Sequence, residues 1–209
     1  VLPVGRITSD QARGLSRIAE TYGNGEMRFT VWQNVLIPNI RDGEVEAVKG
    51  ELDLLGLGHE ASSFRAGLVA CTGNTGCKFA ASATKTHAME IAQKLESQFQ
   101  LDQPLNIHLT GCHHSCAQHY IGDIGLLGCK VERGDDMVEC YHIHQGGGWG
   151  ERQGIGRLLF EFVAFDDVPS LIAAIVGGYL ENRDPDESFV HFAGRHSDEA
   201  FQTMARVAI

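Results

Sequence analysis

The alternation of hydrophobic and polar residues predicts a helix, a strand and a second helix in the first part of the chain. Over residues 5–23 the apolar side chains recur near one helical face, and Thr8 with Gln11 forms a capping-box pattern. Apolar and polar side chains alternate over residues 25–40, which predicts a strand. A helical period returns over residues 44–58 and ends in glycines.

The later part of the chain predicts a mixture of strands and helices. Short apolar runs indicate strands, and longer periodic segments indicate helices. The expected strands cover residues 64–72, 105–112, 120–131, 137–145 and 158–167, and the expected helices cover residues 77–99, 168–183 and 197–209. Two of these strands are joined by the turn sequence RGDD, which predicts a hairpin.

These elements group into two regions, which together predict an α+β fold. We expect a first domain over residues 1–62 and a second, mixed α/β domain over residues 63–209. The junction between them is too short for a flexible linker. The opening residues VLPV resemble the end of a strand, which predicts that the first domain is truncated at its start.

Composition and charge disfavour several classes of function. The 209 residues are 43% hydrophobic, and 27 acidic against 17 basic side chains give a formal net charge of -10. This charge disfavours binding to nucleic acid and to an anionic membrane. No apolar run approaches the roughly 20 residues that span a bilayer, and the first residues lack the pattern of an export signal. We therefore expect a cytoplasmic protein whose six cysteines are reduced.

Four of the six cysteines lie in two glycine-flanked segments, ACTGNTGC and TGCHHSC. Cys71 and Cys77 follow one expected strand, and Cys112 and Cys116 follow another. Because neighbouring strands bring their end loops to one rim of a sheet, four thiols can converge there. Cys77 is also expected to open a helix, whose positive end would favour a thiolate.

The thiol pattern favours an iron–sulfur cluster over two alternatives. Structural zinc prefers cysteines two to four residues apart, which the first pair exceeds. Buried cysteines used as small hydrophobes do not usually recur in glycine-flanked loops. A helix over TGCHHSCAQ would place Cys112 and Cys116 about one turn apart. Cys129 and Cys140 lie on the expected hairpin and are interpreted as packing residues.

The segments CTGNTGCKFA and GCHHSCAQHYIGDIGLLG closely resemble the nitrite and sulfite reductases that carry siroheme bridged to a [4Fe-4S] cluster. RFTVWQNVLIPNI is similar to the family's ferredoxin-like half-domain, and HQGGGWGERQGIGR resembles the glycine loop that lies against the tetrapyrrole. The resemblance covers essentially the whole chain as the C-terminal half of such an enzyme. It implies a ferredoxin-like half-domain followed by a mixed α/β domain that binds siroheme and the cluster.

The resemblance also implies roles for individual residues. The cluster ligands would be Cys71, Cys77, Cys112 and Cys116, and Cys116 would be the catalytic thiolate shared with the siroheme iron. The candidate siroheme contacts are Thr72, Asn74, Gln118, Gly146, Gly147, Gly148, Arg152 and Arg157. Three histidines near the thiols are either further siroheme or proton-relay groups or ordinary polar loop residues: His113, His114 and His119.

The function implied is the six-electron reduction of nitrite to ammonium, with ferredoxin or another low-potential donor supplying electrons. Sulfite reduction to sulfide is the first alternative. Nitrite is favoured because the segment GCHHSCAQHYIGDIGLLG resembles the nitrite reductases of the family more than the sulfite reductases. A related cobalamin-pathway monooxygenase and a non-catalytic iron–sulfur module are further alternatives. The resemblance places most of the cations that bind the small anion in an N-terminal half. The 209-residue chain alone is therefore expected to form an incomplete active site and to need that half as a partner.

Overall fold

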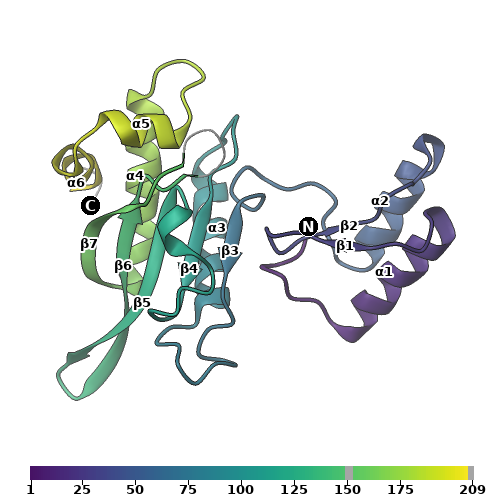
Figure 1. Cartoon of the computed structure of the whole chain (residues 1–209), viewed down its shortest axis with the longest axis horizontal. Coiled ribbons are helices and arrows are strands. Elements are labelled where there is room, and N and C mark those ends of the chain that lie inside the picture. Colours follow the sequence, from purple (N-terminus) through teal and green to yellow (C-terminus); the bar gives the residue numbers. More distant parts are fainter. Residues whose placement is uncertain (149–152, 207–209) are drawn as a thin grey trace.

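The structure is a computed structural model that describes residues 1–148 and 153–206. Figure 1 shows a small N-terminal unit beside a larger unit built around a sheet. Each unit has its own cluster of buried apolar side chains. The expected α+β fold is confirmed. No helix in the described part of the chain is both long and apolar enough to cross a bilayer.

The smaller unit packs two helices against a short hairpin. The capping box is confirmed at its first helix, where Gln11 N donates to Thr8 Oγ1 at 3.1 Å and Thr8 N donates to Gln11 Oε1 at 2.9 Å. Leu2, Leu15 and Leu57 form its buried core. Along the chain the elements are α1 (Ser9–Tyr22), β1 (Arg28–Phe29), β2 (Val35–Leu36), the short 3-10 helix η1 (Asp42–Glu44) and α2 (Val45–Leu54).

The single strand expected over residues 25–40 is wrong, because the segment folds back on itself. β1 and β2 pair antiparallel across a tight turn. In that turn Thr30 N donates to Asn34 O at 2.9 Å, and Gln33 adopts a left-handed backbone with a φ of 58°. Residues 1–4, expected to end a strand, lie outside both sheets.

The larger unit contains a five-stranded mixed sheet in the order β3-β4-β5-β6-β7 (Figure 1). The first three strands run parallel to one another, and the last three form an antiparallel meander. The hairpin expected at RGDD is confirmed between β5 and β6, where Arg133 pairs with Asp136. The strands are β3 (Leu68–Ala70), β4 (Ile107–Thr110), β5 (Ile124–Arg133), β6 (Asp136–Gln145) and β7 (Arg157–Ala164).

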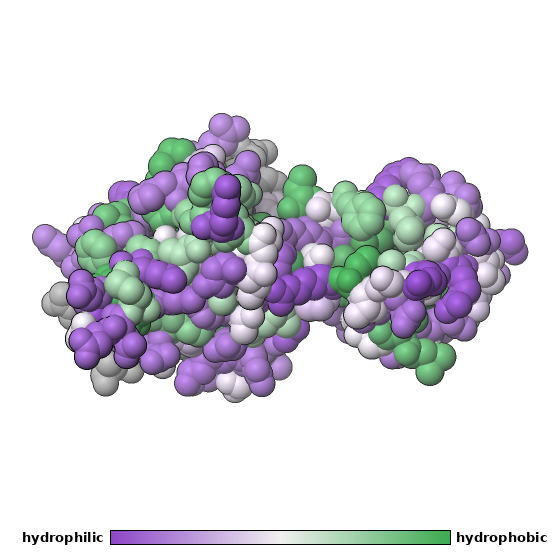
Figure 2. All heavy atoms as spheres, turned by 90° about the horizontal axis from the view of Figure 1, so that it is seen from below, coloured by the Kyte–Doolittle hydropathy of each residue, from purple (hydrophilic) through white to green (hydrophobic). Residues whose placement is uncertain are grey.

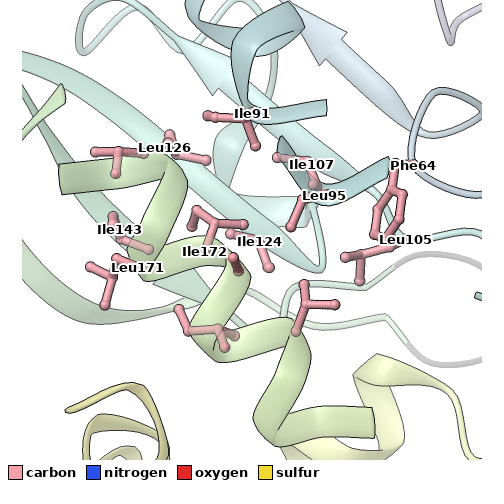
Figure 3. Close-up of a cluster of buried hydrophobic side chains, with 14 of the residues drawn as sticks. Phe64, Ile91, Leu95, Leu105, Ile107, Ile124, Leu126, Ile143, Leu171 and Ile172 are labelled. Carbon is pink, nitrogen blue, oxygen red and sulfur yellow. The ribbon is translucent and has the colours of Figure 1, made fainter. Parts of the chain in front are cut away.

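Helices α3 and α4 pack against each other and against this sheet. Figure 3 shows side chains from both helices and from β4, β5 and β6 meeting in one buried cluster. The labelled members are Phe64, Ile91, Leu95, Leu105, Ile107, Ile124, Leu126, Ile143, Leu171 and Ile172. This core holds the carboxyl ends of β3 and β4 in fixed positions.

The helix predictions hold better in the middle of elements than at their ends. The helices are α3 (Thr84–Gln98), α4 (Val168–Asn182), α5 (Phe189–Arg195) and α6 (Asp198–Arg206), with 3-10 turns η2 (His119–Ile121) and η4 (Phe165–Asp167). The expected helix over 168–183 is confirmed. The helix over 77–99 begins later than expected, and α5 was not predicted. The last part of the helix expected over 197–209 lies outside the described residues.

Candidate functional site

Two neighbouring parallel strands deliver cysteines to the same edge of the larger sheet. β3 pairs with β4, with Leu68 opposite Ile107. The pairing continues past the end of β3, because Cys71 N donates to Leu109 O at 3.0 Å. Gly111 N, just past the end of β4, donates to Cys71 Sγ at 3.2 Å. The expectation that these two loops share one rim is therefore confirmed.

The loop that carries Cys77 covers residues 72–83 and is called the Cys77 loop below. Cys77 N donates to Gly73 O at 2.9 Å, which closes a turn around the thiol. Ala81 N donates to Gly111 O at 2.7 Å, so the loop is tied directly to the segment that follows β4. This tertiary hydrogen bond uses a donor that a helix would need, which helps to explain why α3 starts only at residue 84.

The prediction that Cys77 opens a helix is therefore wrong. The first residue of α3 is Thr84, and its side chain lies beside Cys71 instead. Thr84 Oγ1 donates to Cys71 O at 2.7 Å and lies 3.6 Å from Cys71 Sγ. The first residue of α3 thus lies beside Cys71, and the positive end of a helix favours negative charge near it.

A second positive group lies next to Cys71. Lys85 Nζ donates to the carbonyl oxygen of Ala70 at 3.1 Å and to that of Val4. Burial lowers the pKa of Lys85, Arg6 lowers it further, and the neighbouring Cys71 acts in the opposite direction. A lysine beside a thiol stabilises its thiolate form, which is the form that binds metal.

The loop that carries Cys112 and Cys116 covers residues 111–118 and is called the Cys116 loop below. The loop is not helical, so the one-turn spacing that a helix over TGCHHSCAQ would give does not apply. Ser115 and Gln118 have φ values of 52° and 54°, in the left-handed region that interrupts a right-handed helix. Cys116 is exposed, whereas the other three clustered thiols are half-buried. Cys116 is thus the most exposed of the four clustered thiols.

Glycine is required where the two loops approach each other. A Cβ atom on Gly111 would lie 2.7 Å from Ala80 Cβ, and one on Gly73 would lie 2.8 Å from Thr84 N. Both contacts are closer than real Cβ atoms make. The close approach that sets the thiols at one edge thus depends on these two glycines.

The thiols suit a cluster better than a single ion. Among the described residues, no three His, Cys, Asp or Glu side chains are close enough to bind one metal ion together. A four-iron cluster asks instead for four thiolates around a larger core, each on a different iron, with nearby backbone N–H groups to hydrogen-bond sulfur. The thiols of two facing loops and the N–H of Gly111 on Cys71 Sγ fit that requirement.

The histidines near the thiols are held by hydrogen bonds and by other rings. His114 Nδ1 lies 3.4 Å from Cys112 Sγ. His119 Nδ1 lies 2.8 Å from Ser115 Oγ, and its ring centroid is 4.9 Å from that of His144. Burial lowers the pKa of His119 to about 4, with the neighbouring histidines adding to the effect. His119 is therefore neutral at pH 7.

The three predicted siroheme contacts nearest the thiols differ in their surroundings. Thr72 and Gln118 are exposed on the Cys77 loop and the Cys116 loop. The Asn74 side-chain amide donates to Glu139 Oε1 at 2.6 Å, which ties it to β6. Sequence reasoning missed Glu139, and the only signal for it is a lone acidic residue in the strand MVECYHIHQ.

The predicted glycine contacts directly follow β6. Gly146 N donates to Asp123 O at 2.9 Å, and Gly148 exchanges two backbone hydrogen bonds with Gly154 at 3.1 and 3.2 Å. A Cβ atom on Gly147 would lie 2.5 Å from Gly122 O, so this position needs glycine. Gly146 and Gly148 thus already donate their N–H groups within the chain, and Gly147 is buried.

Of the two arginines predicted to contact siroheme, only Arg157 lies within the described residues. Arg152 lies outside the described residues. Arg157 opens β7, and its guanidinium donates to Asp198 Oδ1 at 2.9 Å and to two backbone carbonyls, of Ala193 and His196, at 3.2 Å. Arg157 thus connects the sheet to the C-terminal helices.

Comparison with known proteins places both units in described families. Residues 1–55 match the model of the nitrite/sulfite reductase ferredoxin-like half domain, and residues 62–200 match that of the nitrite and sulphite reductase 4Fe-4S domain. The expected order of a ferredoxin-like half-domain followed by a cluster domain is confirmed.

Individual relatives are found among both nitrite and sulfite reductases. A ferredoxin–nitrite reductase of Synechococcus elongatus is 39% identical over 175 residues, 84% of this chain and 34% of the relative. A sulfite reductase [ferredoxin] of Mycolicibacterium paratuberculosis is 33% identical over 207 residues, 95% of this chain and 37% of the relative. The chain thus spans about a third of the length of these curated relatives.

Solved structures agree with these matches. The Mycobacterium tuberculosis NirA protein superimposes with a TM-score of 0.86 at 29% identity, over 95% of this chain and 38% of that one. A dissimilatory sulfite reductase I superimposes with a TM-score of 0.81 over 99% of this chain and 68% of that one. At 13% identity, the second match establishes the fold alone.

Proposed function

Because the chain belongs to the nitrite and sulfite reductase family, we propose that it forms the cluster-binding part of a reductase that converts nitrite to ammonium. The observation that carries the proposal is the meeting of the Cys77 loop and the Cys116 loop at the carboxyl ends of two adjacent parallel strands. It supports a shared [4Fe-4S] cluster on Cys71, Cys77, Cys112 and Cys116. The boundary between the two domains is proposed at residues 62 and 63.

The exposure of Cys116 supports its proposed role as the thiolate shared with siroheme. The other three thiols are half-buried in the rim, whereas Cys116 is open on its outward side. A thiolate that binds two centres needs free space on a second side. When bound, the cluster and siroheme together supply single electrons to the reacting anion.

Three of the candidate siroheme contacts, Thr72, Asn74 and Gln118, lie on the two cysteine loops. Residues 146–148 and Arg157 lie at the other end of the strands, because Gln145 pairs with Ile124 at the start of β5 and with Arg157. Gly147 is the candidate glycine at which a side chain would meet the backbone most closely, and Thr72 and Gln118 present exposed polar side chains. Asn74 and Arg157 are held by Glu139 and Asp198, so each would have to bind the cofactor while keeping its present partner. Arg152, Gly146 and Gly148 are proposed as further hydrogen-bond donors to siroheme.

The charges at the rim support the need for a second half of the enzyme. Nitrite is an anion, and its reduction to ammonium consumes protons as well as electrons. His119 is neutral at pH 7, and Lys85 is bound to backbone carbonyls, so neither presents a free positive charge to an anion. Lys78, next to Cys77, lies over the Phe79 ring and is the remaining cation of the Cys77 loop. We propose that the active site takes its other anion-binding cations from an N-terminal half.

The smaller unit offers a surface for that half. Its hairpin exposes 73% of Phe29 and 82% of Val31, and Leu36 and Leu54 are also largely exposed. Figure 2 shows hydrophobic residues on the surface of this unit. A two-stranded sheet is marginal by itself and is stabilised when further strands are added. We expect Val31→Ser to weaken association with the N-terminal half in a pull-down, and unchanged association would contradict this assignment.

Ferredoxin is the proposed electron donor, because it is part of the names of both the Synechococcus elongatus and the Mycolicibacterium paratuberculosis relatives. Nitrite is favoured as the substrate by the higher identity to the nitrite reductase, 39% against 33%. Sulfite is the second candidate, supported by a match that covers 95% of this chain.

A chimaera can test the substrate. This chain would replace the matching third of the Synechococcus elongatus nitrite reductase, and a second chimaera would use the Mycolicibacterium paratuberculosis sulfite reductase as its host. After anaerobic reconstitution, ammonium and sulfide production are measured with each anion. Because each host supplies the proposed anion-binding cations, only a product that is the same in both hosts is assigned to this chain, and we expect ammonium; a product that follows the host would assign substrate choice to the N-terminal half. Faster sulfide formation in both would assign the chain to sulfite reduction instead.

A further inference from the structure

We propose that Glu139 is a positioning residue that holds the Cys77 loop in its ligand-binding shape, through Asn74 and the backbone N–H of Ala83. This inference deepens the proposed cluster role of the chain and rests on it. It concerns a carboxylate outside the thiol set, on a strand that neither cysteine loop follows directly.

The two oxygens of the Glu139 carboxylate bind the two sides of the loop. Oε1 accepts from Asn74 Nδ2 at 2.6 Å, and Oε2 accepts from Ala83 N at 2.8 Å. Asn74 precedes Cys77 in the sequence and Ala83 follows it. One side chain thus bridges the loop on both sides of the thiol. Hydrogen bonds to an ionised acceptor are also stronger than those between neutral groups.

The loop has little regular structure of its own to fix it. Between β3 and α3 the chain forms turns closed by short-range hydrogen bonds, such as Asn74 N to Ser82 O at 3.0 Å and Cys77 N to Gly73 O at 2.9 Å. Such turns open more easily than helices or strands unless other groups hold them. A rigid strand behind the loop supplies that hold through Glu139.

Glu139 is itself held by buried neighbours. The Glu139 side chain is only 29% exposed, and its cross-strand partner on β5 is Lys130, which is exposed. His87 Nε2 lies 3.7 Å from Glu139 Oε2, while His87 Nδ1 is 2.8 Å from the hydroxyl of buried Tyr141. The His87 ring also stacks on Phe165 with centroids 3.4 Å apart. This packing leaves the carboxylate little freedom to move away from the loop.

The charges around the Glu139 carboxylate fit a positioning role. Burial lowers the pKa of His87, so the imidazole facing Glu139 is neutral near pH 7. The direct donors to the carboxylate are an amide and a backbone N–H, which are neutral as well. The negative charge of Glu139 is therefore carried next to the cluster loop, where it opposes the addition of an electron to a bound cluster.

Three variants separate geometry from charge. Glu139→Ala removes both hydrogen bonds and the charge. Glu139→Gln removes only the charge, because the Asn74 amide can reverse and accept from the new amide while Ala83 N keeps an acceptor. Asn74→Ala removes one hydrogen bond and leaves Glu139 in place. Glu132→Gln, an exposed glutamate on the same hairpin, is the matched control.

The first measurement needs no cofactor. Amide hydrogen exchange of residues 72–83 is followed in the apo-chain, after thermal unfolding has shown that each variant folds. We expect exchange at least about tenfold faster in Glu139→Ala and Asn74→Ala, a smaller increase in Glu139→Gln, whose neutral hydrogen bonds are weaker, and unchanged exchange in Glu132→Gln. Unchanged exchange in both of the first two variants would overturn the proposal. If Glu139→Ala does not fold, Asn74→Ala decides alone.

The second measurement uses the anaerobically reconstituted chain. Iron and acid-labile sulfide per chain should fall in Glu139→Ala and stay at the wild-type level in Glu139→Gln, whose cluster should show a more positive midpoint potential. Wild-type cluster content and potential in all variants would refute the positioning role. A wild-type chain that takes up no cluster would count against the proposed function, whereas the exchange result would still test the contact of Glu139 with the loop.

Discussion

The backbone N–H of Gly111 donates a 3.2 Å hydrogen bond to the sulfur of Cys71, which lies at the end of the neighbouring strand. This contact joins the two cysteine loops before any cofactor is considered. Backbone N–H groups that point at sulfur favour its thiolate form and raise the reduction potential of a bound cluster. The relationship makes Gly111 a structural partner of the thiols, although it has no side chain.

Gly111→Ala should separate the loops. The new Cβ would lie 2.7 Å from Ala80 Cβ, so the backbone must shift and the contact with Cys71 lengthens. We expect a loss of about 1–3 kcal/mol in the free energy of unfolding and lower iron and sulfide content after reconstitution. Gly50→Ala is the control, because a Cβ there meets nothing within 4 Å. Equal cluster content in both variants would show that the close approach is dispensable.

Cys71→Ser should abolish the acid-labile sulfide of the reconstituted chain, because a hydroxyl replaces a proposed thiolate ligand. Cys129→Ser is the matched control: this half-buried thiol faces Cys140 across the β5–β6 pair and is not in the proposed ligand set. Its burial raises the pKa of Cys129 to about 11, so it remains a thiol. Iron and sulfide at wild-type stoichiometry in Cys71→Ser would remove Cys71 from the ligand set.

The local pattern of the sequence was sufficient for most elements of the fold. Helix caps and apolar periods depend on neighbouring residues, so the capping box at Thr8 and the core helix over residues 168–182 could be predicted. The hairpin at residues 28–36 was missed because the alternation of apolar and polar residues continues through its turn. The turn is formed by hydrogen bonds between Thr30 and Asn34, which that alternation does not reveal.

The site could be predicted only where strand order determines it. The meeting of Cys71 with the segment after β4 follows from the general behaviour of parallel neighbours. The late start of α3 could not be foreseen, because Ala81 N donates to Gly111 O, a partner distant in the sequence. Glu139 was missed for the same reason, since its contacts with the Cys77 loop are tertiary.

Glu96→Gln should destabilise the larger unit. Arg65 binds the Glu96 carboxylate through two hydrogen bonds, Nε to Oε1 at 2.7 Å and Nη2 to Oε2 at 2.8 Å. We expect a loss of about 1–3 kcal/mol at pH 7 by urea denaturation. Glu90→Gln, at an exposed position on the same helix, is the control.

The Glu96 effect should depend on pH. The hydrogen bond from Arg65 lowers the pKa of Glu96 below its ordinary value of 4.5. The stabilisation is therefore fully present above pH 4.5 and is lost as the pH falls through the lowered folded pKa. The difference between wild type and Glu96→Gln should shrink below pH 4.5, and a difference that stays constant down to pH 2 would contradict the ion pair.

Asp123→Asn should remove a pH dependence of the opposite sign. Asp123 is buried at the start of β5, and burial raises its pKa from 3.8 to about 6, although Asn106 N donates to its Oδ2 at 2.8 Å. A raised folded pKa means that the protonated acid suits the fold better than the carboxylate. The resulting stabilisation is present below pH 3.8 and is lost as the pH rises through about 6. The rise in pKa corresponds to roughly 3 kcal/mol.

The asparagine variant keeps an acceptor for Asn106 N and never ionises. We therefore expect its free energy of unfolding, relative to wild type, to increase by roughly 3 kcal/mol between pH 4 and pH 7, as measured by urea denaturation at each pH. Asp135→Asn, in the exposed turn between β5 and β6, should leave the pH profile unchanged. Parallel profiles for wild type and Asp123→Asn would mean that the Asp123 carboxylate gains enough hydrogen bonding in the fold to offset its burial.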